Sequence, residues 1–531
     1  MDTAIYYNGT VLTMDEPLYA EAVLVKDGVI CQVGKKEEIL AKRRPDTRMV
    51  DLQGAALLPA FIDPHSHITA FAKTLGAVDL TGSKSLAEIT GRLDDFAARA
   101  KPSPDQWVAA FGYDNNNLAE KRHPDRDLLD RYPFPLVATH ASGHMGVMNS
   151  AALRAAQITA DTPDPEGGKI GRRADGREPN GYLEEAAFTE ATAHVAAPSQ
   201  EQLLRQVEQA QEIYLKNGIA TAQDGLTKAE DWALLKALAE QGRLKLDVVA
   251  YPNLPDNRAI ALENPMYRKK YCNRLKIGGY KIFLDGSPQG RTAWMTQPYE
   301  GAADGYRGYP AHQDADVVEY MRQALADGMQ LLAHCNGDAA AQQMIDAYAR
   351  ALCCAKPGED IRPVMIHAQL VRQDQLKCMK KLGMVASFFV AHTYHWGDVH
   401  LKNFGERRAS QISPVRSAIE DGVTYTFHQD TPVIQPNMLE TLWSAVNRVT
   451  KDGYVLGENQ RVTPLEALRA ITVNAAYQYF EECEKGSIYP GKRADFVILD
   501  RDPLSVDPMA LKDLRVLATI KDGKTLYEAG R

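Results

Sequence analysis

The sequence has no long apolar run, and this absence excludes a large class of proteins. No stretch of the 531 residues is long and apolar enough to cross a bilayer. The first residues, Met1 to Gly9, also lack the basic region followed by an apolar region that marks a signal peptide. We therefore expect a cytoplasmic protein without a membrane partner.

Cys-x-x-Cys motifs and blocks of like charge are missing as well, and two of the cysteines, Cys353 and Cys354, are adjacent. The 7 cysteines are scattered and odd in number, and no Cys-x-x-Cys occurs, which predicts reduced thiols. The net charge of −8 is spread along the chain, which argues against nucleic acid as a partner. The hydrophobic content of 45% is enough for a large core.

Two histidines one residue apart end the apolar run that starts at Leu57. The segment reads Leu-Leu-Pro-Ala-Phe-Ile-Asp-Pro-His-Ser-His-Ile. Side chains alternate along an extended strand, so His65 and His67 should point the same way. Two adjacent imidazoles fill a core poorly but bind a divalent metal well. Surface histidines beside a turn at Pro64 are the competing interpretation.

Four later segments repeat this plan, in which an apolar run contains or precedes a residue that can bind metal. They are Gly278–Leu284 with Lys281, Met329–Ala333 with His334, Pro363–Ile366 with His367, and Val423–Phe427 with His428 and Asp430. The ordered set resembles the amidohydrolase superfamily of metal-dependent barrels. In that superfamily strand one carries His-x-His, strand four Lys, strands five and six a His each, and strand eight Asp.

Strand-like and helical patterns alternate regularly from Ser199, which forms a capping-box pattern with Gln202. The remaining strands are expected at Ile219–Gln223, Leu246–Tyr251 and Met384–Phe389. This alternation indicates an α/β protein with a parallel sheet, and eight strands suggest a closed TIM-like (β/α)8 metal-dependent hydrolase barrel over residues 57–485. Active sites of such barrels lie at the C-terminal ends of the strands, where nearly all candidate ligands fall.

The two chain ends are expected to form one small β-sandwich domain. Residues 1–56 and 486–531 contain turn pairs at Asn8-Gly9, Asp27-Gly28 and Asp522-Gly523, yet neither end could bury a core alone. Residues from about 69 to 200 form a large insertion after strand one. Helical patterns, aromatic residues and a loop rich in Gly and Pro, Asp161–Asn180, are expected there.

An insertion of this kind resembles the branch that contains N-substituted formamide deformylases. The stretch Ser142-Gly143-His144, followed by Asn149-Ser150-Ala151-Ala152-Leu153, is similar to that branch's Gly-His…Asn-Ser-x-Ala-Leu. The resemblance implies that His144 contacts the substrate, and a helix-start histidine with Asn149 or Ser150 as a cap is the alternative. Trp294 and His392 are also expected to line the substrate pocket, whereas His123, His140, His194 and His312 are assigned no part in it.

The candidate ligands suit two divalent cations, with zinc as the first choice. His65 and His67 would hold one ion, and His334 and His367 the second, because neutral imidazole suits zinc. A bound metal lowers the pKa of a water molecule to roughly 7 and polarises a carbonyl. Hydrolysis of an amide at neutral pH needs both effects.

Lys281 lies in the apolar segment Gly-Tyr-Lys-Ile-Phe-Leu-Asp. Burial lowers the pKa of an ammonium group, and a neutral amine can take up carbon dioxide to form a carbamate. In binuclear amidohydrolases the strand-four lysine bridges two cations in this form, and the match in position implies the same role for Lys281. A lysine that reaches solvent or pairs with Asp285 is the alternative.

Asp430 follows strand eight in Phe-His-Gln-Asp-Thr-Pro-Val. The resemblance implies that this aspartate contacts a metal, takes the proton from the attacking water and passes it to the leaving nitrogen. Relatives often have Ser before this Asp, whereas this chain has His428-Gln429. His428 is therefore a rival ligand or substrate contact.

The leading hypothesis is hydrolysis, by metal-activated hydroxide, of a C–N bond in a small non-peptide amide or an N-acyl or N-formyl compound. A mononuclear deaminase of a heterocyclic amine could use the same barrel, but such enzymes usually carry a Glu near the strand-six histidine. This chain has Ala-Gln-Leu-Val-Arg after His367. A non-catalytic regulatory relative should have lost ligands, and none is lost. A homodimer is the default oligomeric state.

Overall fold

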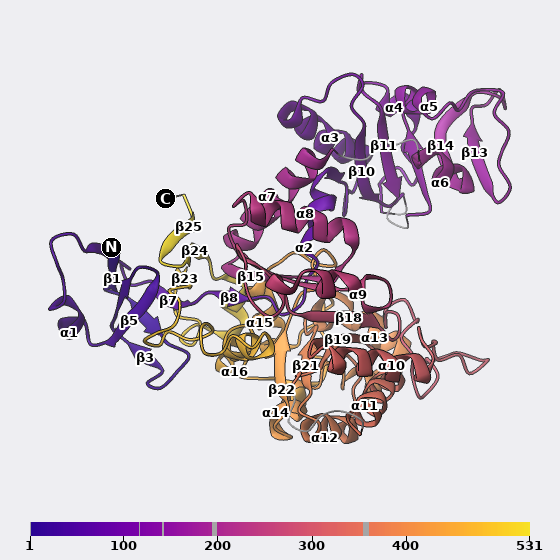
Figure 1. Cartoon of the computed structure of the whole chain (residues 1–531). Coiled ribbons are helices and arrows are strands. Elements are labelled where there is room, and N and C mark those ends of the chain that lie inside the picture. Colours follow the sequence, from indigo (N-terminus) through magenta and orange to yellow (C-terminus); the bar gives the residue numbers. More distant parts are fainter. Residues whose placement is uncertain (1, 116, 141–142, 194–198, 354–359, 531) are drawn as a thin grey trace. The chain divides into compact units, whose positions relative to one another are not determined.

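The computed structural model describes residues 2–115, 117–140, 143–193, 199–353 and 360–530. The chain forms two compact units, the first from residues 1–69 and 210–531 and the second from residues 70–209. Figure 1 shows the sheets and helices of each unit. Within the described ranges, no helix is both long and apolar enough to cross a membrane.

Two parallel sheets of the first unit hold the strands that carry candidate ligands. The order of one is β17 (Leu275–Ile277), β16 (Asp247–Pro252), β15 (Ile219–Thr227) and β8 (Phe61–Ile62). The order of the other is β18 (Gly279–Phe283), β19 (Gln330–Cys335), β20 (Val364–His367), β21 (Val385–Phe388) and β22 (Thr424–Phe427). Each of these strands except β17 overlaps a predicted segment, and β17 was not predicted. His334 and His367 lie inside β19 and β20 rather than just beyond them.

Backbone contacts connect these two sheets at two places. A parallel bridge between Asn253 and Lys281 joins the end of β16 to β18. At the second place, the N–H of His67 donates to the carbonyl of Thr431 at 2.8 Å, and the N–H of Asp430 donates to the carbonyl of His65 at 3.3 Å. The residues after β8 and after β22 are therefore neighbours, although they are more than 360 positions apart in the sequence.

Helices follow most of these strands, as the alternation in the sequence predicts. In chain order they are α7 (Gln200–Lys216), α8 (Ala229–Glu240), α9 (Leu254–Glu263), α10 (Asp314–Ala326), α11 (Asp338–Leu352), α12 (Gln373–Lys381), α13 (His392–Ala409), α14 (Val415–Glu420), α15 (Met438–Asn447), α16 (Pro464–Ala470) and α17 (Val473–Gln478). The predicted capping box before α7 is confirmed. The N–H of Gln202 donates to Ser199 Oγ at 3.3 Å, and the N–H of Ser199 donates to Gln202 Oε1 at 2.7 Å.

Strands from both chain ends form two further sheets in the first unit. One has the order β5 (Val29–Gly34), β4 (Ala22–Lys26), β1 (Thr3–Tyr7) and β6 (Arg48–Asp51), with helix α1 (Lys36–Leu40) after β5. The other has the order β25 (Lys524–Glu528), β24 (Val516–Lys521), β23 (Phe496–Leu499), β7 (Ala56–Pro59), β2 (Thr10–Leu12) and β3 (Tyr19–Ala20) (Figure 1). Tyr6, Leu57, Phe496 and Ile520 belong to one buried cluster, so residues from both ends share a core.

The predicted turns at the chain ends have different outcomes. Strands β4 and β5, around Asp27-Gly28, and strands β24 and β25, around Asp522-Gly523, pair as antiparallel hairpins. The turn at Asn8-Gly9 instead moves the chain from one sheet to the other, because β1 pairs with β4 and β6 while β2 pairs with β3 and β7. Asn8 has a φ of 61°, in the left-handed region that Asn tolerates well.

The second unit contains a six-stranded sheet that the sequence analysis missed. Its order is β13 (Gly168–Arg172), β14 (Pro179–Glu185), β12 (Met145–Met148), β11 (Leu136–His140), β10 (Val108–Tyr113) and β9 (Ala77–Asp79). Its helices are α3 (Leu86–Ala100), α4 (Arg126–Leu129), α5 (Ser150–Ala155) and α6 (Ala186–Thr192), and α2 (Ile68–Leu75) begins just before the unit. Strand β13 even lies within the predicted loop Asp161–Asn180. Residues in such short strands owe their preference for strand conformation to packing against neighbouring strands, which a single sequence does not display.

Candidate metal centre

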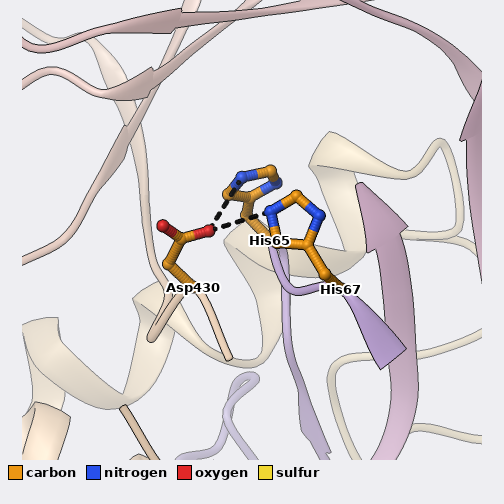
Figure 2. A group of neighbouring side chains, drawn as sticks. All are labelled: His65, His67 and Asp430. Atoms are coloured by element: carbon orange, nitrogen blue, oxygen red, sulfur yellow. Dashed lines mark hydrogen bonds and ion pairs between the residues drawn. The ribbon is translucent and has the colours of Figure 1, made fainter. Parts of the chain in front are cut away.

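His65, His67 and Asp430 form one compact group of potential metal ligands. Their ligand atoms all lie within 4.8 Å of one another. Asp430 Oδ1 is 3.3 Å from His65 Nε2 and 3.1 Å from His67 Nε2. Figure 2 shows both imidazole rings turned toward this carboxylate oxygen. The loops after β8 and β22 therefore bring the first and last predicted ligands together.

Gln223 determines which nitrogen of His65 faces this group. Gln223 Nε2 donates to the carbonyl of Pro64 at 2.8 Å and to the hydroxyl of Tyr479 at 2.9 Å, so the amide oxygen is the atom 2.6 Å from His65 Nδ1. An amide oxygen only accepts, which places the His65 proton on Nδ1 and leaves a lone pair on Nε2. This lone pair faces the Asp430 carboxylate without a hydrogen between them. A divalent cation suits such a pair of donor atoms, so the residues fit a metal.

Lys281 lies beside the same nitrogen of His65. Its Nζ is 3.3 Å from His65 Nε2, and its side chain is fully buried. Burial lowers the pKa of Lys281 to about 7, although the charge of Asp430 opposes this shift. The side chain does not reach solvent, which contradicts the alternative of a lysine that extends to the surface.

Asp285, the other alternative partner of Lys281, binds backbone groups instead. Its carboxylate accepts hydrogen bonds from the N–H groups of Trp294 at 3.0 Å, Asn336 at 2.9 Å and Gly337 at 2.7 Å. These bonds fix the segments that follow β18 and β19. Asp285 therefore supports the site from outside, while Lys281 faces its interior.

His334 and His367 complete the group from neighbouring strands. His367 Nε2 lies 3.0 Å from His334 Nδ1 and 3.9 Å from Asp430 Oδ2. His334 Nε2 lies 3.2 Å from the carbonyl oxygen of Gly286 and 3.0 Å from the amide nitrogen of Asn336, and its Nδ1 faces His367. All six predicted ligand residues thus surround one region of the first unit.

Burial keeps these imidazoles neutral, which is the form that binds metal. It lowers the pKa of His65 to about 3 and that of His334 to about 4, and the charge of Lys281 acts in the same direction. Burial and the neighbouring His334 also hold the pKa of His367 well below its ordinary value. The ring nitrogens therefore keep their lone pairs at neutral pH.

The predicted pocket residues lie in three different places. Trp294 is half-buried in the segment between β18 and α10. His392 begins α13 and is 3% exposed, and the rings of Phe389 and Trp396 each lie 4.5 Å from its own. His144 belongs to the second unit, where its Nδ1 lies 3.1 Å from Glu185 Oε2 and its side chain is 67% exposed. The substrate contacts of His144, Trp294 and His392 stay predictions.

Two features of the His144 segment bear on its alternative interpretation. Asn149 caps α5, because its side chain accepts a hydrogen bond from the N–H of Ala152 at 2.9 Å. Ser142, which belongs to the same sequence motif, lies outside the described residues, as does His194. The capping role proposed for Asn149 is therefore present.

The sequence analysis missed the residues that orient the ligands. Gln223 closes the predicted strand Ile219–Gln223, so its position at a strand end was an available signal. Ser387 lies in the apolar strand β21 and contacts His428 at 2.8 Å. No sequence signal marked Ser387, because a single hydroxyl in a buried strand is common.

The chain is similar to known proteins over almost its whole length. The amidohydrolase family model matches residues 48–527. The chain is 30% identical over 545 residues to N-substituted formamide deformylase from Arthrobacter pascens, covering 98% of this chain and 97% of that protein. It is 27% identical over 548 residues to the putative amidohydrolase YtcJ from Bacillus subtilis, covering 99% of each chain.

A crystal structure of an uncharacterized metal-dependent hydrolase from Pyrococcus furiosus is also similar. It aligns with 95% of this chain and all of its own, with a TM-score of 0.77 and 26% identity. The fold of the chain is therefore that of the metal-dependent hydrolases. Matches across almost the whole sequence show that the chain belongs to the amidohydrolase family and is an enzyme that hydrolyses carbon–nitrogen bonds.

Proposed function

We propose that the chain hydrolyses a C–N bond in a small non-peptide amide, of the N-acyl or N-formyl type. The observation that carries the proposal is the convergence of unprotonated donor atoms, above all His65 Nε2 and Asp430 Oδ1 at 3.3 Å. The similarity to a protein named as an N-substituted formamide deformylase supports this class of bond.

The proposed scaffold is a closed (β/α)8 barrel. The uniformly parallel pairings of β15 to β17 and of β18 to β22 support it. The backbone contacts between the residues after β8 and those after β22 support closure of the ring. In such a barrel the ligand-bearing strand ends would form the mouth of the active site.

Two zinc ions are the proposed cofactors, because imidazole nitrogen and carboxylate oxygen both suit zinc. His65, His67 and Asp430 would hold one ion, and His334 and His367 the other. Lys281, as its carbamate, would offer one of its two oxygen atoms to each ion. When bound, the ions supply Lewis acidity, which polarises a carbonyl and lowers the pKa of water.

Asp430 is the proposed proton carrier. Its Oδ1 faces both His65 and His67, while Oδ2 lies 3.9 Å from His367 Nε2. Its side chain is 14% exposed, whereas that of His65 is 1% exposed. Oδ2 is therefore the oxygen that would accept a proton from water and return it to the leaving nitrogen.

The test combines metal analysis with a substrate panel. Protein purified without chelator should contain about two zinc ions per chain. It should release primary amine from N-formyl or N-acetyl alkylamines and arylamines, lose this activity with chelator and regain it with zinc. Full activity without metal would contradict the proposal. Release of ammonia from heterocyclic amines, without amide cleavage, would favour the deaminase alternative, and metal binding without any turnover would favour a regulatory protein.

A further inference from the structure

A buried chain of polar groups leads away from the metal ligand His367. His367 Nδ1 lies 3.1 Å from His428 Nε2, and His428 Nδ1 lies 2.8 Å from Ser387 Oγ. His428 and Ser387 are fully buried, and His367 is 3% exposed. His367 ends β20, Ser387 lies within β21 and His428 directly follows β22, so the chain of contacts crosses three adjacent strands.

Only two proton arrangements satisfy this chain if all the rings are neutral. In one, Ser387 donates to His428 Nδ1, His428 donates from Nε2 to His367 Nδ1, and His367 carries its proton on Nε2. In the other, His367 donates from Nδ1 to His428 Nε2, and His428 donates from Nδ1 to Ser387 Oγ. Only the second arrangement leaves a lone pair on His367 Nε2, which faces His334 Nδ1 at 3.0 Å.

We propose that His428 is a positioning residue. Its Nε2 accepts a hydrogen bond from the Nδ1–H of His367, and its own Nδ1–H donates a hydrogen bond to Ser387 Oγ. It thereby fixes His367 in the tautomer that presents Nε2 to a metal. This proposal rests on the proposed function, because it needs a cation between His334 and His367. It also gives a role to His428, which the sequence analysis left as a rival ligand or substrate contact.

The surroundings of His428 favour a positioning role over direct contact with substrate. Both of its ring nitrogens already have partners, and none of its surface is exposed. The rings of His65 and Phe389 lie 5.2 and 5.4 Å away, and they cover it further. A substrate or a water molecule therefore has no free nitrogen of His428 to contact.

Two substitutions of His428 separate tautomer control from simple packing. In His428→Gln, the side-chain oxygen can occupy the place of the imidazole Nε2 and accept from His367. In His428→Asn, the shorter side chain reaches only the place of Nδ1, and His367 loses its acceptor. Zinc affinity of the metal-free proteins, measured by competition with a coloured chelator, should fall about 10- to 100-fold for one of the two ions in the Asn variant. The Gln variant should stay within about threefold of the wild type by the same reasoning.

Ser387→Ala tests the far end of the chain. It leaves the Nδ1 proton of His428 without an acceptor, which favours the wrong tautomer and should weaken the same zinc ion. Ser417→Ala is the matched control, because Ser417 is also a buried serine that accepts a side-chain hydrogen bond, from Gln460 at 2.8 Å, and it touches none of the ligands. Zinc affinity of the control should match that of the wild type.

Three results separate the possible outcomes. Near-normal zinc affinity of His428→Gln, together with weakened affinity of His428→Asn and Ser387→Ala, supports the relay of hydrogen bonds from His367 through His428 to Ser387. Equal zinc affinity in the Gln and Asn variants, at unfolding temperatures like that of the wild type, would overturn it. If the Asn variant does not fold, nitrogen-15 NMR of labelled histidines in the wild type and in Ser387→Ala decides, since the relay requires the proton of zinc-loaded His367 on Nδ1. A wild type that binds no zinc would contradict the proposed function itself, which keeps the two failures distinct.

Discussion

Lys485 Nζ lies 2.6 Å from Asp247 Oδ2, in a buried ion pair that connects the C-terminal segment to β16. Lys521 Nζ lies 2.6 Å from the same oxygen, and all three side chains are at most 2% exposed. One carboxylate therefore balances parts of two buried ammonium charges. Glu481 and Asp495 provide the other partners of these lysines.

We expect Asp247→Asn to destabilise the protein strongly. Removal of one member of a buried ion pair leaves an uncompensated charge, which typically costs about 3–5 kcal/mol of unfolding free energy. Urea unfolding of the wild type and the variant measures this difference. Asp161→Asn is the control, since Asp161 pairs with Arg177 at a site where both side chains are more than 70% exposed. Equal stability of the wild type and Asp247→Asn would show that the buried pair does not hold the segment.

The same cluster predicts a specific dependence of stability on pH. Burial alone would raise the pKa of Glu481, but the charges of Lys485 and Lys276 outweigh this effect and lower the pKa to about 2. In the unfolded chain a glutamate has a pKa of about 4.3, so the unfolded state binds more protons between these values. The contribution of Glu481 is therefore complete above the unfolded pKa and is lost as the pH falls toward about 2.

Substitution of Glu481 should flatten this acid limb. In Glu481→Gln the group no longer titrates, so the unfolding free energy should fall less steeply than in the wild type between about pH 5 and pH 2. Urea unfolding at a series of pH values measures the slopes. Glu458→Gln, in an exposed pair with Arg461, should keep the wild-type slope. Identical slopes for the wild type and Glu481→Gln would refute the prediction.

Lys281→Ala should remove metal as well as activity. If the carbamate supplies oxygen atoms to both ions, the variant should contain less than the wild-type metal, and short carboxylates should restore part of it. Carbon-13 NMR of wild type incubated with labelled bicarbonate should show a carbamate signal that Lys281→Ala lacks. Lys245→Ala, at an exposed lysine that pairs with Glu212, should retain the signal. Normal metal content in Lys281→Ala would show that the lysine is structural.

Asp430→Asn should separate metal binding from proton transfer. The amide keeps one oxygen for the metal but is a far weaker base, so kcat should fall by about 10²–10⁴-fold while most of the metal remains. Substrate binding should change less than kcat. His428→Asn, measured with zinc in excess, provides the comparison. If that variant had no turnover while Asp430→Asn remained near normal, His428 would be the base.

Removal of the C-terminal strands should prevent folding of the first unit. Strand β23 pairs with β7, and Phe496 and Ile520 belong to the same buried cluster as Tyr6 and Leu57. A chain that ends before Gly486 should therefore aggregate in size-exclusion chromatography, because β7 and the N-terminal core lose their cover. A chain shortened only by residues 529–531 is the control. A soluble and active form of the longer truncation would contradict the shared core.

The sequence marked the candidate ligands more clearly than the residues that orient them. His334, His367 and Asp430 each accompany an apolar run, and Lys281 interrupts one, so the chemistry of single residues marked them. The contact between His65 and Gln223 joins residues 158 positions apart, and no local pattern encodes it. The β-sheet of the second unit was not predicted for a related reason. Strands as short as β9 have too few residues to show a clear alternation of apolar and polar side chains.

The pairing of Ala56 with Leu499 across β7 and β23 also has a consequence for biosynthesis. A ribosome adds about 5–20 residues per second, so the roughly 440 residues between these partners take on the order of half a minute or more to appear. During that time β7 and the strands beside it have an open edge and an uncovered apolar face. The nascent chain must therefore be shielded from other chains, and its first residues are among the last to reach their final partners.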